Sequence, residues 1–459
     1  MVSISLSEIV KNQRTFFKSG KTRNLDFRIL QLKKLKMAIQ KNEELIFNAL
    51  KKDLNKPEIE SYITELGLSL IEIDNMIKNL KKYAKPKKVK TPLAYIKSKS
   101  YIISEPLGVT LIISPWNYPF QLTINPLIGS IAAGNCCIIK TSSMSPNTSS
   151  VIRTFINNTF NENYITVVEN KKDTSSMILK EKFDYIFFTG SPRIGRIVME
   201  SAAKNLTPVT LELGGKSPCI VDTDINIKNT CRRICFGKFS NSGQTCVAPD
   251  YLLVNKNIKN DLIDELKTTI TNFYGSNPQN SKYFGRIINS KHFNRLKNLL
   301  QGQNIIFGGK MDENERYISP TILDNVSLSS PIMQEEIFGP ILPVIEYSSL
   351  QKAIDIINTK SKPLALYIFS KDKNVQNVIL QRTSSGGVCI NDTLIHITTD
   401  TLPFGGVGES GMGNYHGKAS FDTFSHKKSI LKSPFSIDTK VYPPYKITLE
   451  KAKKLLKFL

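Results

Sequence analysis

The first part of the chain has apolar residues at helical spacing. Between residues 25 and 39 they recur at every third or fourth position, and a similar pattern begins near Pro57 and continues to about residue 84. Such spacing gathers the apolar side chains on one face of an α-helix. Ser7 is a candidate N-cap of a first helix and Gly20 a candidate stop. We therefore predict that residues 1–84 form packed helices.

From Gly108 the pattern changes to short apolar runs that alternate with amphipathic segments. It predicts strands over 109–114, 136–140, 165–168 and 184–188, and helices over 121–133 and 146–159. Strands and helices that alternate in this way form a parallel sheet covered on both faces, and such sheets bind nucleotides at the carboxyl ends of their strands. We therefore expect a doubly wound α/β fold with functional loops after the strands.

A second α/β unit is predicted after the first. It starts with a strand over 219–221, continues with a helix that Asp224 would cap and that ends near Phe239, and returns to a strand over 251–254. Residues 85–107 contain Pro, Lys and short β-like pieces, which indicate an arm that leaves the first domain. The chain closes with a short basic helix that carries leucines on one face.

Length and composition are typical of a multidomain globular protein. The chain has 459 residues, of which 40% are hydrophobic and 22% charged, and these values exclude a disordered or collagen-like chain. The seven cysteines show no paired spacing of a zinc site or a disulfide framework, which indicates a reducing compartment. No leader pattern opens the sequence, and no run reaches the roughly 18 apolar residues of a membrane span. We therefore expect a cytoplasmic protein with no stable membrane span.

The net charge of +23 raises the question of an anionic partner. Lysines are spread over the whole length, and no basic segment is interleaved with aromatic residues on which bases could stack. We therefore expect no nucleic-acid partner. Contact of the basic C-terminal helix with a membrane surface stays open, beside packing against protein.

The stretch NSGQTCVAPD, residues 241–250, is the main candidate for chemistry. It sets Cys246 between a turn of small residues and a predicted strand. A nucleophilic thiol must be reached by substrate and must ionise near neutral pH, and backbone N–H groups of a Gly-rich bend favour the thiolate. An inert buried cysteine is the alternative.

Two further loops at predicted strand ends carry candidate chemistry. Residues 190–195 join a strand to a helix, where small side chains let a phosphate approach the helix N-terminus, although the spacing is not the usual GxGxxG. A turn without a ligand is the alternative for this loop. Glu212 stands just before a Gly-Gly turn. It is either a solvated loop charge or a partly desolvated base with a raised pKa.

Taken in order, six motifs of this chain resemble the aldehyde dehydrogenase superfamily, and the short N-terminus and the ending MGNYHGKASFDTFSH are most similar to its class 3 branch. The motifs are PWNYP, FTGSPRIG, LELGGKSP, NSGQTCVAPD, EEIFGP and PFGGVGESGMG. The resemblance covers nearly the whole chain. It implies a Rossmann-type cofactor domain over 1–84 and 108–210, an α/β catalytic domain over 211–394, and a small β bridging or oligomerisation arm with a tail over 85–107 and 395–459. It also implies a homodimer.

The resemblance implies an NAD(P)-dependent oxidation of aldehydes to carboxylic acids. An aldehyde cannot readily expel hydride by itself, whereas attack by the Cys246 thiolate gives a thiohemiacetal whose oxyanion can do so and leave an acyl thioester. The implied oxyanion donors are the Asn117 side-chain amide and the Cys246 N–H. Glu212 is the implied base that activates water for hydrolysis.

The resemblance also implies a set of cofactor-binding residues, with Lys140 on the adenosine ribose and Glu336 on the nicotinamide ribose. The family often reads K-P-S-E at the adenosine ribose, but here Lys140 is followed by Thr, Ser and Ser143. A carboxylate at that position repels a 2′-phosphate, whereas Ser143 does not. We therefore predict that NADP is accepted at least comparably to NAD. The full set is Trp116, Lys140, Ser143, Gly190, Ser191, Gly195, Leu213, Glu336 and Phe338.

Two other functions stay open from the sequence. One is a CoA-acylating aldehyde dehydrogenase, in which CoA intercepts the thioester, although the retention of Glu212 favours water. The other is a basic binding protein that keeps only the scaffold. The four histidines resemble no zinc-ligand set, so no metal site is expected and a zinc alcohol dehydrogenase is disfavoured. Medium-chain aliphatic or aromatic aldehydes are the substrates that the resemblance implies.

Overall fold

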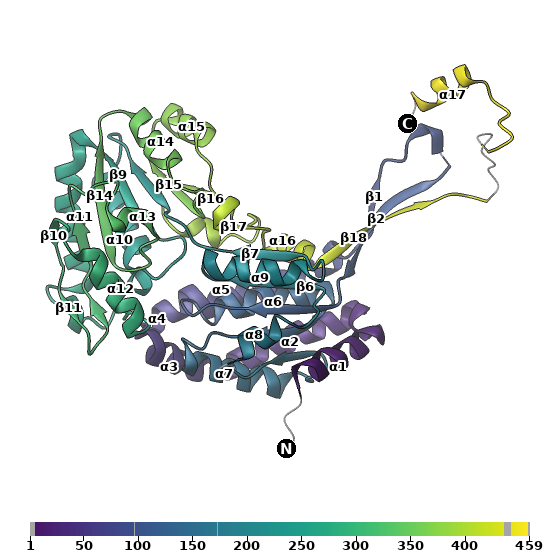
Figure 1. The fold of residues 1–459 in the computed structure, drawn as a ribbon, viewed down its shortest axis with the longest axis horizontal. Coiled ribbons are helices and arrows are strands. Elements are labelled where there is room, and N and C mark those ends of the chain that lie inside the picture. The colour runs from purple at the N-terminus through teal and green to yellow at the C-terminus, as the bar shows by residue number, and fades with distance from the viewer. Residues whose placement is uncertain (1–4, 96, 172, 436–441, 458–459) are drawn as a thin grey trace.

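Two large sheets and a three-stranded arm organise the chain (Figure 1). The structure is a computed structural model that describes residues 5–95, 97–171, 173–435 and 442–457. The six-stranded and seven-stranded sheets form two lobes that lie side by side, and the arm extends away from them with the C-terminal residues at its far end (Figure 1).

Helices cover the first lobe, as the apolar spacing predicts. The first of them is capped by Ser5, whose side chain accepts a hydrogen bond from Glu8 N at 3.2 Å. The prediction of Ser7 as the cap was therefore wrong. The Ser7 hydroxyl instead donates to Glu181, far along the chain. These elements are α1 (Leu6–Lys18), α2 (Leu25–Lys41), α3 (Glu43–Leu54), α4 (Glu58–Ser61), the π-helical turn η2 (Tyr62–Leu66) and α5 (Gly67–Tyr83).

The first large sheet has the strand order β17-β7-β6-β3-β4-β5 and is parallel except for β17. The chain runs outward from β3 first to β4 and later to β6 on the opposite side, which is the topological switch point where such sheets bind ligands. The predicted helices 121–133 and 146–159 are confirmed. The elements are β3 (Val109–Ile113), α6 (Gln121–Ala133), β4 (Cys136–Lys140), α7 (Pro146–Thr159), β5 (Ile165–Val167), α8 (Thr174–Ile178), β6 (Tyr185–Thr189), α9 (Pro192–Ala203), β7 (Val209–Glu212) and β17 (Gly411–Met412).

Helix α6 is buried along its whole length and carries no charged side chain. It ends at Gly134, whose φ of +93° favours glycine, and an added Cβ there would lie 2.7 Å from the Arg28 guanidinium carbon. Because α6 starts directly after the PWNYP loop, its burial fixes that loop at the carboxyl end of β3.

The second large sheet has the order β10-β13-β14-β9-β8-β15-β16. Its first helix is capped by Asn226, which accepts from Asn229 N at 2.9 Å, so the prediction of Asp224 as the cap was wrong. The elements are β8 (Pro218–Val221), α10 (Ile227–Phe239), β9 (Tyr251–Asn255), α11 (Lys259–Tyr274), α12 (Ser290–Leu300), β10 (Ile305–Phe307), β11 (Met311–Asp312), β12 (Tyr317–Ile318), β13 (Thr321–Leu323), α13 (Pro331–Gln334), β14 (Ile341–Tyr347), α14 (Leu350–Asn358), β15 (Ala365–Phe369), α15 (Lys373–Arg382) and β16 (Gly387–Ile390).

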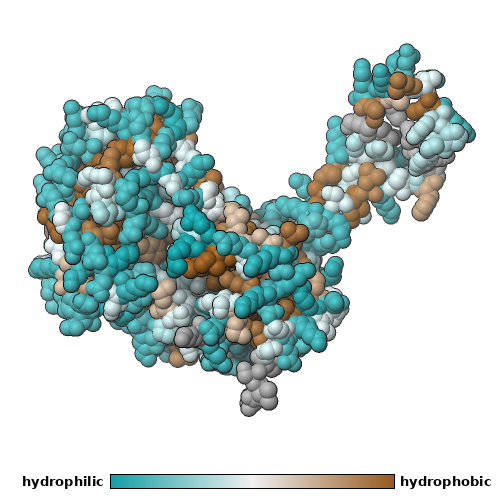
Figure 2. All heavy atoms as spheres, in the orientation of Figure 1, coloured by the Kyte–Doolittle hydropathy of each residue, from teal (hydrophilic) through white to brown (hydrophobic). Residues whose placement is uncertain are grey.

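The arm pairs β2 with β1 on one side and β18 on the other, all antiparallel. Before it reaches the arm, the C-terminal part of the chain adds β17 to the first sheet and packs α16 against α6. Figure 2 shows hydrophobic side chains on the arm and tail, where Leu431, Phe435 and Leu449 are exposed. Among the described residues, no helix combines the length and apolar character needed to cross a membrane. The elements are β1 (Lys87–Val89), β2 (Lys99–Pro106), α16 (Gly417–Thr423), β18 (Ser425–Lys432) and α17 (Leu449–Leu456).

Candidate active site

Cys246 follows a turn with unusual backbone geometry. Asn241 adopts a left-handed φ of 51° there. The Gln244 side chain holds the turn, because its Nε2 donates to the carbonyl oxygens of Asn241 and Arg286 at 3.0 and 2.9 Å and its Oε1 accepts from Ile288 N at 2.9 Å. A fully used buried amide of this kind makes a rigid support. The thiol is therefore presented by a fixed loop.

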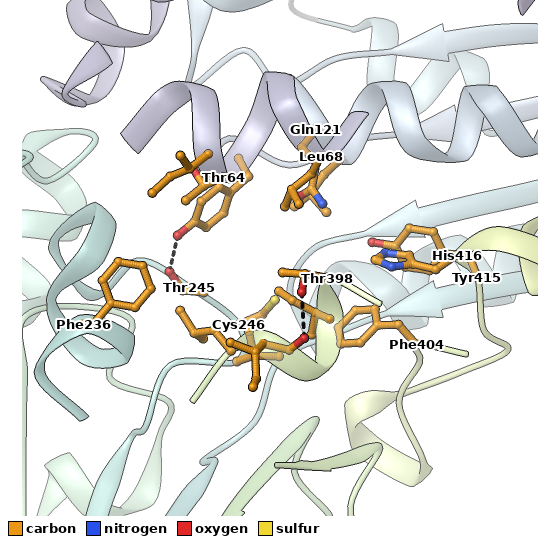
Figure 3. A pocket seen from close by; sticks show the side chains of 17 residues that line it. Thr64, Leu68, Gln121, Phe236, Thr245, Cys246, Thr398, Phe404, Tyr415 and His416 are labelled. Carbon is orange, nitrogen blue, oxygen red and sulfur yellow. Dashed lines mark hydrogen bonds between the residues drawn. The ribbon is translucent and has the colours of Figure 1, made fainter. Parts of the chain in front are cut away.

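Two cavities meet at Cys246. One has a volume of about 130 Å³ and mainly apolar walls, with Leu68, Phe236 and Phe404 among them (Figure 3). The other has a volume of about 310 Å³ and contains carboxylates, an amide and an arginine. Cys246 and Leu122 line both. The sulfur thus stands where an apolar ligand on one side and a polar ligand on the other can meet.

The polar cavity lies at the carboxyl ends of β3, β6 and β7, as expected for a doubly wound sheet. Gly195 lies within α9, where an added Cβ would come 2.8 Å from Leu213 Cδ2. Among the described residues, Lys140 and Ser143 stand outside the wall of this cavity, at the end of β4. Most of the predicted site residues do line it: Trp116, Asn117, Gly190, Ser191, Glu212, Leu213, Cys246, Glu336 and Phe338.

The PWNYP loop and the Cys246 loop are joined by direct hydrogen bonds. Asn117 Nδ2 donates to Gln244 O at 3.1 Å, and Asn241 Nδ2 donates to Asn117 O at 2.8 Å. The hydroxyls of Tyr118 and Thr245 are 2.8 Å apart. Hydrogen bonds between residues far apart in the sequence therefore fix the position of the Asn117 amide relative to the Cys246 thiol.

Burial governs the ionisation of the thiol. Desolvation, with the carboxyls of Glu336 and Glu212 nearby, raises the pKa of Cys246 to about 12, although the N–H groups of Cys246 and Val247 act in the opposite direction. In the protein without ligands, burial therefore outweighs the backbone dipoles that the sequence indicated. The thiol needs a base, or a change in its surroundings, to become a nucleophile.

Glu212 is an unsolvated carboxyl in the same cavity. Its side chain is 2% exposed, and neither oxygen has a hydrogen-bond partner among the described residues. Burial raises the pKa of Glu212 well above its ordinary value. Of the two alternatives from the sequence, the structure has the desolvated carboxyl and not the solvated loop charge.

The carboxyl of Glu336 is held in place from behind by a buried ion pair. Lys216 contacts Asp250 and also donates to Glu335 O at 2.9 Å, and Asp250 Oδ1 accepts from Ile337 N at 2.8 Å. Residues of three motifs therefore meet at the Lys216–Asp250 ion pair. These motifs are LELGGKSP, NSGQTCVAPD and EEIFGP. Burial raises the pKa of Glu336 to about 8.

A second polar hollow continues the same sheet edge at the ends of β4 and β5. Ser143, Arg153 and Glu169 are among its lining residues. The guanidinium of Arg153 lies 3.6 Å from the Glu169 carboxylate, and both are about half exposed. Lys140 is half-buried at the end of β4, and burial lowers its pKa. Cationic and hydroxyl groups are therefore available beyond the main cavity.

Two polar residues of this cavity lie outside the six motifs and were not found from the sequence. His292 and Arg295 lie on α12 and line the polar cavity. The His292 ring lies 4.9 Å from the Trp116 ring, and burial lowers its pKa to about 4, so it is neutral at pH 7. Their spacing of three positions, which puts both on one helix face, was the only available signal.

These groups together fit a dinucleotide. Gly190 and Ser191 line the cavity, and Ser191 is the N-cap of α9, so this helix starts at the cavity, where a phosphate is favoured. The carboxyl oxygens of Glu336 can accept hydrogen bonds from ribose hydroxyls. The second hollow lies farther along the sheet edge, at the ends of β4 and β5. The shape and chemistry follow the rule for doubly wound sheets.

Comparison with known proteins agrees with this geometry. The model of the aldehyde dehydrogenase family matches residues 5–430. The 4,4′-diaponeurosporen-aldehyde dehydrogenase of Staphylococcus aureus is 52% identical over 438 residues, which are 95% of each chain. The dimeric NADP-preferring aldehyde dehydrogenase of Rattus norvegicus is 50% identical over 427 residues, which are 93% of this chain and 94% of that one.

A solved structure shows the same similarity in three dimensions. The substrate-bound state of Staphylococcus aureus AldH superposes with a TM-score of 0.96 and 51% identity, and covers 99% of this chain and 100% of that chain. Sequence and fold therefore agree over almost the full length. The chain belongs to the aldehyde dehydrogenase family and is an NAD(P)-dependent oxidoreductase that acts on aldehydes.

Proposed function

We propose that the protein oxidises apolar aldehydes to carboxylic acids through a thioester on Cys246. The observation that carries the proposal is the position of Cys246 at the junction of an apolar and a polar cavity. An aldehyde in the apolar cavity would have its carbonyl carbon at the sulfur. A nicotinamide cofactor bound in the polar cavity supplies the hydride acceptor.

The Cys246 sulfur attacks the carbonyl carbon and forms a thiohemiacetal, while the thiol proton leaves to a base. The Asn117 amide and the Cys246 N–H would stabilise the oxyanion, and loss of one such donor costs about 3 kcal/mol in the barrier. Asn117 is suited to this role because its backbone and its side chain are both held by hydrogen bonds. Loss of hydride then leaves an acyl thioester.

Glu212 is proposed as the base for hydrolysis of that thioester. A carboxylate removes a proton from water, the resulting hydroxide adds to the acyl carbon, and the Cys246 thiolate leaves. The absence of hydrogen-bond partners for Glu212 among the described residues leaves its oxygens free for water. Its retention in the cavity supports water rather than CoA as the acyl acceptor.

For the cofactor, we propose the predicted residues as ligands. Ser191 and the start of α9 would bind the pyrophosphate, with Gly190 and Gly195 allowing close approach. Glu336 would accept from the nicotinamide ribose, with Phe338, Leu213 and Trp116 packing beside it. Lys140, Ser143 and Arg153 would bind the adenosine end and admit a 2′-phosphate. The rat relative is named NADP-preferring, and this supports NADP as a cofactor beside NAD.

The assembly is proposed to be a homodimer in the cytoplasm. The outer edge of β18 is unpaired in the described chain, and a strand of this kind can pair with a second copy. A relative at 50% identity is named dimeric. All seven cysteines are free, which is consistent with a reducing compartment. We also propose domain boundaries at residues 84, 107, 210 and 394.

The test is turnover by the purified protein with hexanal and benzaldehyde, with NAD and NADP given separately. We expect reduced cofactor and the corresponding acid, and no turnover by Cys246→Ala. Addition of CoA should leave the acid as the product. Formation of acyl-CoA would replace the proposal with the CoA-acylating reaction, and activity in Cys246→Ala would remove the nucleophile from it.

A further inference from the structure

A fully buried ion pair lies beside the PWNYP loop and has no part in the chemistry above. Lys56 Nζ and Glu65 Oε1 are 2.5 Å apart, and both side chains are 0% exposed. A buried charge is costly unless it is paired and its remaining hydrogen-bonding groups are used. Neither residue belongs to one of the six motifs.

The Lys56 ammonium contacts both Glu65 and this loop. Besides the carboxylate, Nζ donates to Asn117 O at 3.4 Å and lies 4.0 Å from the centroid of the Tyr118 ring. The second oxygen of Glu65 accepts from Phe120 N at 2.9 Å and from Gln121 N at 3.2 Å. The pair therefore contacts the segment from Asn117 to the start of α6 at both of its ends.

The Asn117 carbonyl oxygen is also held by a residue of the Cys246 loop. Asn117 O also accepts from Asn241 Nδ2 at 2.8 Å, and Asn241 N donates to Glu60 Oε1 at 2.7 Å. The Asn117 side-chain amide is in turn bound to Gln244 O at 3.1 Å. With its backbone oxygen held by two donors and its side chain by one acceptor, Asn117 has little freedom to move relative to Cys246.

We propose that Lys56, together with Glu65, is a positioning residue that holds the Asn117 amide where the oxyanion forms. The pair is close to neutral as a whole, so it acts through geometry rather than through its own field. This inference rests on the proposed function, in which Asn117 is an oxyanion donor. A displacement of about 1 Å in such a group lowers the rate by up to about 100-fold.

The test variant replaces both charges, since Lys56→Met alone would leave Glu65 buried without a partner. In Lys56→Met/Glu65→Gln the methionine keeps the length of the chain without donors, and the glutamine still offers an oxygen to Phe120 N. A matched control is Lys259→Met/Asp324→Asn, which removes another largely buried ion pair, 2.7 Å long, between the start of α11 and the residue after β13. It also removes the contact of Lys259 with the exposed Glu346. This control should leave kcat unchanged.

A double-mutant cycle with Asn117→Ala separates positioning from general loss of structure. We expect Lys56→Met/Glu65→Gln to lower kcat about 10- to 100-fold, with unchanged cofactor Kd from the fluorescence of Trp116, the single tryptophan. In the Asn117→Ala background the same change should lower kcat by less than about 2-fold, because the positioned group is gone.

Three results would overturn the inference. An equal loss of kcat in both backgrounds, or no loss in the first, would remove Lys56 as a positioning residue and leave the role of Asn117 intact. A normal kcat in Asn117→Ala would instead contradict the proposed oxyanion donor, and the inference with it. Retained cofactor binding and Tm in each variant show that the comparison is made between folded proteins.

Discussion

The carboxylate of Glu336 lies directly against the backbone of Gly214, where an added Cβ would be 2.1 Å from Oε2. The residues come from two motifs that are far apart in the sequence, and they meet because Lys216 and Asp250 hold the loop of Glu336 beside the Gly-Gly turn. No side chain at position 214 is compatible with this position of the carboxylate. The absence of a side chain at Gly214 therefore leaves the space that the carboxyl group of Glu336 occupies.

Gly214→Ala should weaken cofactor binding by displacing Glu336. The φ of Gly214 lies outside the left-handed region, so the added methyl group acts by contact rather than by backbone strain. We expect Kd for NAD and NADP, measured by Trp116 fluorescence, to rise about tenfold, which corresponds to about one lost charge-assisted hydrogen bond. In Glu336→Ala the same glycine substitution should have no further effect, and an additive effect would contradict this explanation.

Cofactor affinity should rise with pH up to about 8. Burial raises the pKa of Glu336 to about 8, so at pH 7 the carboxyl is mostly protonated, and binding of ribose hydroxyls to the carboxylate must release that proton. Below the pKa, each rise of one pH unit should lower Kd about tenfold. Above the pKa, Kd should be constant. Titration of Trp116 fluorescence between pH 6 and 9 measures this, and Glu336→Gln should remove the dependence.

Local pattern was sufficient for the elements with strong periodicity, such as α6 and α7, whose bounds were predicted correctly. It was not sufficient for helix caps. Ser5 and Ser7 are equivalent by sequence, but the Ser7 hydroxyl is used by Glu181. Asp224 pairs with Lys371 at 3.3 Å while Asn226 caps α10. Tertiary partners decide such choices, and a local rule contains no information about them.

In the site, too, local pattern predicted some residues and tertiary contacts decided others. Three motifs predicted cavity residues because they follow β3, β6 and β7, and parallel strands bring such ends to one edge of the sheet. Cys246 and Glu336 instead precede β9 and β14 of the second sheet, and only the family resemblance indicated a site role for Glu336. His292, Arg295 and Lys56 belong to helices or turns without a motif and reach the site only through folding. The small-residue turn at Cys246 can be read locally, whereas the burial that raises the pKa of the thiol is a tertiary property that the sequence does not show.

Ser143→Glu should shift the cofactor preference from NADP toward NAD. Ser143 lines the second hollow with Arg153, and a carboxylate there would face the 2′-phosphate of NADP. Two unit charges 4 Å apart in water repel by about 1 kcal/mol, so a doubly charged phosphate should bind about 10- to 30-fold more weakly. Kd for NAD should change little, and Ser176→Glu on the surface of α8 controls for net charge. A parent protein that prefers NAD by a hundredfold or more would contradict the prediction.

Glu212→Gln should separate acylation from hydrolysis. The glutamine fits the same buried space but cannot take a proton from water, and a general base contributes about 10²- to 10⁴-fold. We expect one rapid turnover of reduced cofactor per site, then a steady-state rate lower by that factor, with the acyl group on Cys246 detected by mass spectrometry. Glu72→Gln is the control, because Glu72 is also buried and burial raises its pKa to about 7, but it binds Gly417 N on α16. If the first turnover is slowed as much as the later ones, Glu212 must act before the thioester, as the base that removes the proton from the Cys246 thiol.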